Sequence, residues 1–349
     1  MRRQLLLWSL ATALVIGSGA AATFAWWWTK EPMLDVQHAP AVVTRRSGEL
    51  SANLCGTAFR RASLRYRVNE GDWTDLAQTD PRSPAPWWTI ELLPKVLREG
   101  INDVEIHASA VGRTAATERL TFEYDPAPLS LPTLVDWRQP LEVQDGHWEV
   151  VEVDGERRVR PVPGSERYDR ILLATGAFAG GRRVETDMVF RGFRPWQTWA
   201  GFGVLTLWGG HLDQPGRFPR NGWLYAVAWY MKPYGPWCEF SVKQGDGARV
   251  DAFTGNGIAD PHPDSRWSLI AECWPETDGR GEHVGYRQRM KLWPSGEPEP
   301  AEWLECSDRG GARLPAGEYA VAVVAHECQV EFGPLRVLPL ATAPARPNR

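Results

Sequence analysis

The sequence predicts an all-β protein in which two β-sandwich domains follow one N-terminal hydrophobic helix. Its 349 residues exceed the length of one ordinary hydrophobic core, and short runs of alternating apolar and polar residues recur along it. The 33 glycines and 28 prolines supply the turns between these runs. We therefore expect residues 1–30 to be a signal anchor or signal peptide, 31–41 a stalk, 42–126 the first domain, 127–140 a linker or lead-in strand, 141–340 the second domain and 341–349 a disordered tail.

The first thirty residues carry targeting information. Arg2 and Arg3 precede 24 uncharged residues from Leu5 to Trp28, which suffices for a transmembrane helix of about 20 residues. Trp26–Trp28 lie where an aromatic belt meets the membrane surface. Ala20–Ala22 offer an A-x-A cleavage site, so a cleaved signal peptide stays open as the alternative. In both cases the basic N-terminus predicts that the body of the protein is exported.

Composition argues against nucleic acid as a partner and against a disulfide scaffold. The net charge is −4 with acidic and basic residues interspersed, so no basic stripe is available for phosphates. The odd number of cysteines leaves at least one thiol free, and no C-x-x-C pair suggests a metal or redox site. Cys306 and Cys328 either pair or remain buried thiols. The five cysteines are Cys55, Cys238, Cys273, Cys306 and Cys328.

The first domain shows short strand-like runs separated by turn residues. The expected strands are 42–54, 64–69, 88–92, 101–108 and 120–124. Two phrases within them, Leu64–Trp73 (LRYRVNEGDW) and Leu97–Ile106 (LREGINDVEI), resemble a hairpin and a following strand of bacterial immunoglobulin-like modules. This resemblance implies an immunoglobulin-like sandwich that acts as a spacer or adhesion module.

Two strands of the second domain each have one charged face. Arg182–Phe190 alternates apolar residues with Arg183, Glu185 and Asp187, and Tyr286–Trp293 alternates them with Arg287, Arg289 and Lys291. If both strands share a sheet, we expect the acidic and basic rows to pair across strands. The alternative is that the basic row forms a groove for an acidic polysaccharide.

Tryptophan is unusually abundant, with 19 residues against 8 Tyr and 11 Phe. The runs 201–211 and 221–231 are apolar on both faces, which predicts central strands or the lining of a cleft. We expect Trp223 and Trp229 to pack in the core. Trp196, Trp199 and Trp237 lie in Pro/Gly-rich stretches, where aromatic rings are available to stack on sugars.

Three phrases of the second domain resemble bacterial exported domains of the laminin-G-like, concanavalin A-like jelly-roll class. They are Gly201–His211 with Gly222–Tyr230, Arg289–Trp303, and Val324–Gly333. The resemblance implies a jelly-roll sandwich that binds carbohydrate or another surface ligand, and often a structural calcium. Leu207 departs from it, because the pattern has Arg before Trp208. The candidate ligand-binding residues are Trp196, Trp199, Trp208, His211, Trp237, Arg287, Lys291 and His326. The candidate calcium ligands are Asp213, Asp246, Asp251, Asp260 and Asp264.

Catalysis is the less favoured interpretation. Glycosidases of this architecture place carboxylates as E-x-D-x-E or E-x-D-x-x-E, whereas here Val189 and Phe190 follow Glu185 and Asp187 at the positions of the acid. A lyase would need basic and Tyr/His groups, for which His211, His326, Tyr230 and Arg287 are the candidates. A third hypothesis is a structural protein of the cell envelope. The sequence thus favours an exported, membrane-tethered protein that binds a glycan or surface ligand, with no catalytic residues and no cofactor beyond calcium.

Overall fold

The computed structural model describes the β-rich body of the chain. Contacts group its residues into two compact units: one holds the described residues up to Val36 with Cys55–Trp88 and Val104–Arg119, and the other holds the remainder. The described residues are 32–44, 51–78, 86–127, 130–139, 141–163, 169–193, 200–211, 226–231, 239–244, 251–253, 262–307 and 315–341. The expected membrane segment 1–30 lies outside them, as does nearly all of the expected tail. Within the described ranges, no helix is long and apolar enough to cross a membrane.

The strands before Asp125 form two sheets. A three-stranded sheet has the order β1-β3-β6, and a five-stranded sheet has the order β2-β8-β7-β4-β5. Their bounds are β1 (Leu34–His38), β2 (Val42–Val43), β3 (Ala52–Ala58), β4 (Ser63–Val68), β5 (Thr74–Leu76), β6 (Trp87–Leu92), β7 (Gly100–Ser109) and β8 (Ala116–Tyr124), with a short 3-10 helix at Pro94–Val96.

The expected strand 101–108 is confirmed as part of β7, in which the alternate residues Val104, Ile106 and Ala108 are fully buried. The expected single strand 42–54 is wrong, because β2 ends at Val43 and β3 begins only at Ala52. The immunoglobulin-like assignment and the domain boundaries stay predictions.

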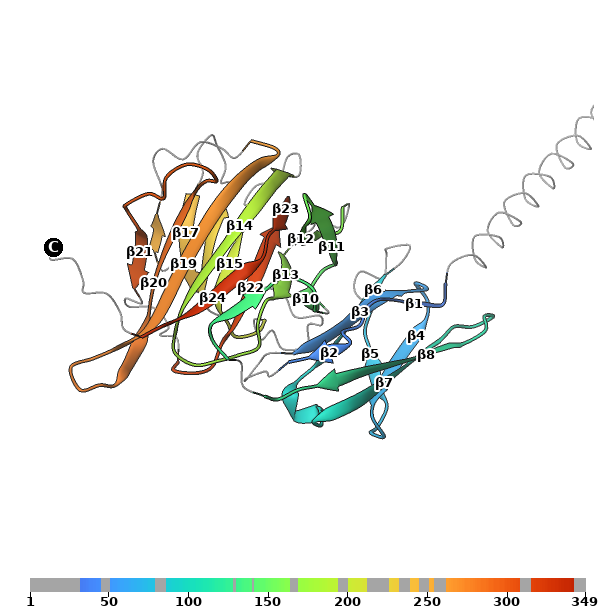
Figure 1. Ribbon diagram of the computed structural model, residues 1–349. Helices are drawn as coiled ribbons and strands as arrows, with labels where there is room; N and C mark the ends of the chain where they lie inside the picture. The colour runs from blue at the N-terminus through green and yellow to red at the C-terminus, as the bar shows by residue number, and fades with distance from the viewer. Residues whose placement is uncertain are drawn as a thin grey trace, which may run out of the picture. The chain divides into compact units, whose positions relative to one another are not determined.

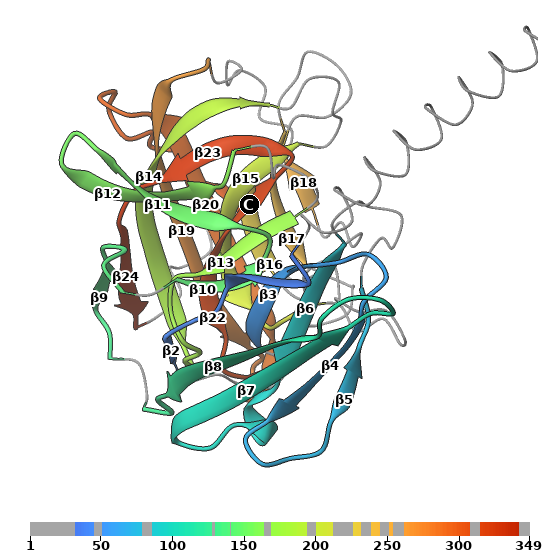
Figure 2. The ribbon, with the colours of Figure 1, turned by 90° about the vertical axis from the view of Figure 1, so that its right-hand side faces the viewer.

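The larger unit contains a two-sheet sandwich. Its seven-stranded sheet has the order β10-β13-β22-β15-β16-β17-β18. Its nine-stranded sheet has the order β11-β12-β23-β14-β19-β20-β21, with β24 paired to β14 and β9 paired to β24. The two sheets lie as stacked layers in Figures 1 and 2. The bounds in the first sheet are β10 (Glu142–Asp145), β13 (Asp169–Leu173), β15 (Gly201–Trp208), β16 (Ala226–Met231), β17 (Glu239–Gln244), β18 (Asp251–Phe253) and β22 (Ala320–His326). Those in the second are β9 (Thr133–Val135), β11 (Trp148–Val153), β12 (Glu156–Pro161), β14 (Gly181–Phe193), β19 (Ser265–Thr277), β20 (His283–Pro294), β21 (Leu304–Ser307), β23 (Cys328–Phe332) and β24 (Leu335–Leu340).

The main core fills the space between these two sheets. One continuous cluster of buried apolar side chains takes members from both sheets, including Phe202 and Val323 from one and Met188 and Leu269 from the other. A second cluster, which includes Leu205 and Trp208, lies on the opposite face of the seven-stranded sheet. Every residue of β15 is buried as a result, so the expectation that 201–208 is a central strand covered on both faces is confirmed.

The charged outer face of the nine-stranded sheet is neutralised by arginine–carboxylate pairs. The rows on β14 and β20 do share a sheet, but β19 lies between them, so the expected direct pairing of the two rows is wrong. Glu272 of β19 supplies the bridge instead. Its carboxylate accepts from Arg183 Nη1 at 2.8 Å and from Arg289 Nε at 2.5 Å.

Candidate functional site

The β11–β12 hairpin forms one wall of the candidate site. Asp154 and Gly155, which connect its strands, both have positive φ values of 53° and 79°. This is the backbone that a two-residue turn of type I′ requires, and Asp-Gly is a preferred sequence for it. β11 is the last strand of the nine-stranded sheet on this side, and Figure 1 shows the hairpin at the edge of its layer.

One face of this hairpin passes from the core into solvent. Trp148 and Val159 point into the main core. Because side chains alternate along a strand and cross-strand partners share a face, Val150, Glu152 and Arg157 lie on that same face. Val150 is 42% exposed, and Glu152 and Arg157 are also exposed. The inner face of the hairpin therefore extends past the core and presents one apolar and two charged groups.

Residues 136–139 and Leu141 form the opposite wall. Trp137 has a left-handed backbone with φ 59°, and its indole Nε1 donates to the carbonyl oxygen of Gly333 at 2.8 Å. The buried ring thereby holds the segment onto the sandwich. Asp136 accepts from the backbone N–H of Arg138 at 3.2 Å and pairs with its Nε at 3.1 Å, so the Arg138 guanidinium already has a carboxylate partner.

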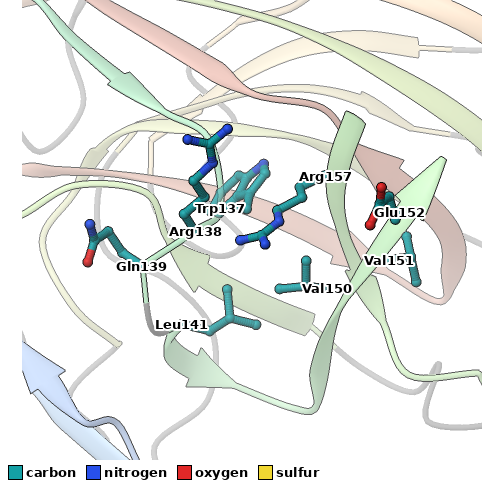
Figure 3. A pocket seen from close by; sticks show the side chains of 8 residues that line it. All are labelled: Trp137, Arg138, Gln139, Leu141, Val150, Val151, Glu152 and Arg157. Atoms are coloured by element: carbon teal, nitrogen blue, oxygen red, sulfur yellow. The ribbon is translucent and has the colours of Figure 1, made fainter. Parts of the chain in front are cut away.

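Between these walls is an open hollow of about 480 Å³, a size within the range of small-ligand pockets. We call it the hairpin hollow, and Figure 3 shows its lining. A neighbouring hollow of about 400 Å³ shares Arg138, Glu152 and Arg157 with it and continues toward Gly155 and Pro334. The hairpin hollow is lined by Trp137, Arg138, Gln139, Leu141, Val150, Val151, Glu152 and Arg157.

Arg157 is the distinctive group of the hairpin hollow. Its cross-strand partner in the ladder is Glu152, yet in Figure 3 its guanidinium reaches toward Trp137 rather than toward Glu152. No carboxylate of the described ranges forms an ion pair with it. The neighbouring Glu156 is already engaged, because it pairs with Arg158 at 3.4 Å and with Arg266 at 3.0 Å. The hairpin hollow therefore combines an available guanidinium with apolar surface.

The basic residues expected to bind ligand lie elsewhere, in the ion-pair network of the nine-stranded sheet. Arg287 is 2% exposed, and its Nε donates to Glu305 at 2.5 Å. Lys291 is 7% exposed, donates to Glu299 at 2.7 Å and lies 4.4 Å from the centre of the Trp303 ring. The hydrogen bond from Lys291 lowers the pKa of Glu299. These contacts satisfy both charges within the protein, and a role for them in binding stays a prediction.

Three other candidates are described but are not brought together with the hairpin hollow. Trp208 is fully buried in the second apolar cluster. His211 is 1% exposed, lies edge-on to the Trp208 ring at 5.2 Å, and has its Nδ1 3.7 Å from Glu91 of the same compact unit. His326 is the last residue of β22, opposite Gly201 of β15. Trp196, Trp199 and Trp237 lie outside the described residues.

The carboxylates of the incomplete glycosidase motif are held by arginines. Glu185 accepts from Arg183 Nε at 2.6 Å, and Asp187 accepts from Arg266 Nε at 2.7 Å and from the buried Arg158. Val189 and Phe190, at the positions of the missing acid, are buried apolar residues. Both carboxylates therefore serve as partners of arginines on the charged outer face of the nine-stranded sheet.

The described ranges contain no cluster of side chains that could bind calcium. No group of three or more His, Cys, Asp or Glu side chains gathers there. Asp264, one expected ligand, instead pairs with Arg191 at 2.6 Å. The other candidates lie outside the described residues or, for Asp251, have only a described backbone. A structural calcium stays a prediction.

The described strands define the class of the protein as all-β, with a two-sheet sandwich as its larger part. No family model and no curated protein matches the chain. Among solved structures it is similar to the exoplasmic/lumenal domain of VIP36 in a form bound to Ca²⁺ and mannose, with 13% identity over 57% of this chain and 85% of that one, at a TM-score of 0.37.

Two further solved structures show similarity of the same order. The carbohydrate-binding module CBM66 from Bacillus subtilis has 10% identity, coverage of 55% and 91%, and a TM-score of 0.33. The legume lectin-like domain from Entamoeba histolytica has 8% identity, coverage of 56% and 90%, and a TM-score of 0.32.

Proposed function

We propose that the protein is an exported, membrane-tethered glycan-binding protein without catalytic activity. The observation that carries this proposal is the hairpin hollow, an open site at the edge of a β-sandwich that offers apolar, amide and charged groups side by side. Sugars require this mixture, because a pyranose has apolar C–H faces and a rim of hydroxyl groups. The remaining elements of the proposal, export and the membrane anchor, rest on Arg2, Arg3 and the apolar run Leu5–Trp28.

Binding is favoured over hydrolysis by the state of the carboxylates. A glycosidase needs one carboxyl group that donates a proton and a second that attacks or activates water. Glu185 and Asp187 both accept hydrogen bonds from arginine guanidiniums of the protein. The two positions where the acid would stand are occupied by the buried apolar residues Val189 and Phe190.

The test is retention of the full chain, purified in detergent, on immobilised polysaccharides, with the same samples assayed for new reducing ends and for unsaturated products. We expect retention on at least one polysaccharide and no product. Product formation would overturn the non-catalytic part of the proposal, and absence of retention on all of them would overturn glycan binding. Loss of retention in Trp196→Ala or Trp199→Ala would assign part of the binding to the aromatic stretches outside the described residues.

A further inference from the structure

We propose that the hairpin hollow binds a carboxylated sugar, namely a uronate residue within a glycan chain. This inference rests on the proposed function and specifies its ligand class and its site. It also locates the acidic ligand away from the basic row on β20, where Arg287 and Lys291 are paired with glutamates.

Arg157 binds the carboxylate of the uronate. A guanidinium presents its donors in a planar fork that matches the two oxygens of a carboxylate. Arg157 is exposed and belongs to no ion pair of the described ranges, so a ligand carboxylate would not have to displace a protein carboxylate. Arg138 also lines the hollow, but its guanidinium is already paired with Asp136, so Arg157 is the lining cation that is available to a ligand. Glu152 adds one exposed carboxylate to the lining.

The sugar ring has an apolar surface beside this guanidinium. Leu141 and Val150 come from opposite walls, and Figure 3 shows both side chains below Arg157 in the same hollow. Val150 is 42% exposed in the free protein, so covering it with the C–H face of a pyranose removes apolar surface from water. The ring and its carboxylate would then be held by adjacent groups, which sets the orientation of the sugar.

Polar groups at both ends of the hairpin hollow can form hydrogen bonds with the hydroxyl groups of the sugar. The Gln139 amide both donates and accepts, and the Glu152 carboxylate accepts. The neighbouring hollow shares Arg138, Glu152 and Arg157 and continues to Gly155 and Pro334. This continuity gives room for the next residue of the chain, so the site fits an internal uronate of a polymer better than a free monosaccharide.

The test is calorimetric titration of the full chain in detergent with three tetrasaccharide probes. These are a galacturonate tetramer, its methyl ester, which keeps the rings but lacks the charge, and a neutral galactose tetramer. Arg157→Gln removes the charge, and Arg157→Lys keeps the charge without the fork. The matched control is Arg280→Gln, an exposed arginine in the turn between β19 and β20. Urea unfolding of each variant confirms that it is folded.

We expect the acidic tetramer to bind at least tenfold more tightly than its methyl ester. Arg157→Gln should weaken acidic binding at least tenfold, Arg157→Lys should weaken it less, and Arg280→Gln should leave it within twofold. Equal affinity for acid and ester, or an unchanged affinity in folded Arg157→Gln, overturns the inference while glycan binding stands. If none of the probes and no polysaccharide binds, the proposed function itself fails.

Discussion

Glu152 and Arg157 face each other across the β11–β12 hairpin but form no ion pair. Cross-strand charges of opposite sign contribute only about 0.2–1 kcal/mol at an exposed position. The Arg157 guanidinium is therefore available to the carboxylate of a ligand. The absence of an ion pair with Glu152 lowers the stability of the protein only slightly. Arg157 therefore stays outside the ion-pair network of the nine-stranded sheet, as the inferred uronate site requires.

Replacing Glu152 separates its effect on binding from its effect on folding. Because Glu152 forms no ion pair with Arg157, we expect Glu152→Gln to change the free energy of unfolding by less than about 0.5 kcal/mol. Removal of its negative charge should tighten binding of the acidic tetramer by a few-fold. Urea unfolding and calorimetry measure the two effects. A stability loss above about 1 kcal/mol, or weaker acidic binding, would contradict this interpretation.

Asp187 should behave in the opposite way, as a structural residue. Its carboxylate accepts from Arg158, whose side chain is 1% exposed, and from Arg266. Truncating one partner of a buried pair leaves the other charge poorly compensated, because Arg158 keeps only longer contacts with the Glu156 carboxylate and the Glu331 carbonyl oxygen, both at 3.4 Å. We expect Asp187→Asn to lower the free energy of unfolding by about 2 kcal/mol. The control is Glu185→Gln, because Arg183 keeps Glu272 at 2.8 Å. Equal effects of the two substitutions would argue against this account.

Arg182 is a buried cation held by carbonyl groups. Its guanidinium donates to Gly180 at 2.7 Å, Tyr319 at 2.8 Å and Phe178 at 3.1 Å, and the Phe178 ring lies 4.1 Å below it. A lysine cannot reproduce the fork, so carbonyl groups would be left unsatisfied in the interior. We expect Arg182→Lys to cost about 3 kcal/mol in urea unfolding, against less than about 0.5 kcal/mol for Arg336→Lys, whose side chain is 61% exposed. A cost below about 1 kcal/mol would show that the carbonyl contacts are unimportant.

Acid should destabilise the protein through His38. Burial, and secondly the nearby His147, lower the pKa of His38 from 6.5 to about 4. Between these values the unfolded chain binds a proton that the folded protein does not, so stability rises with pH there. The contribution is complete above about pH 6.5 and falls by on the order of 2–3 kcal/mol as the pH drops toward 4. His38→Gln should flatten the pH dependence of unfolding in this window, and an unchanged slope would contradict the assigned pKa.

The strands were predictable where local pattern and burial agree. Val104, Ile106 and Ala108 alternate in the sequence and are buried in the structure, and the apolar run 201–208 is a strand covered on both faces. Pairing between distant strands was not predictable. The insertion of β19 between β14 and β20 depends on tertiary topology, so sequence alone could not assign Glu272 as the partner of Arg183 and Arg289.

The candidate site could likewise be predicted only in part from the sequence. The Asp154-Gly155 dipeptide between alternating runs is a hairpin signal that could have located β11 and β12. Nothing in the sequence indicates that Val150, Glu152 and Arg157 extend beyond the core, because this depends on where the sheet ends. The opposite wall depends on a contact between Trp137 and Gly333, which are 196 positions apart in the sequence.

Hydrogen exchange of the full chain, with and without a bound acidic polysaccharide, shows directly where the ligand lies on the protein. We expect slower exchange of the backbone amides of residues 137–139, Leu141 and 148–157 on binding, with no change in β4 and β7. Protection confined to 194–199 and 232–238, or no protection anywhere in the presence of the polysaccharide, would contradict binding at the hairpin hollow.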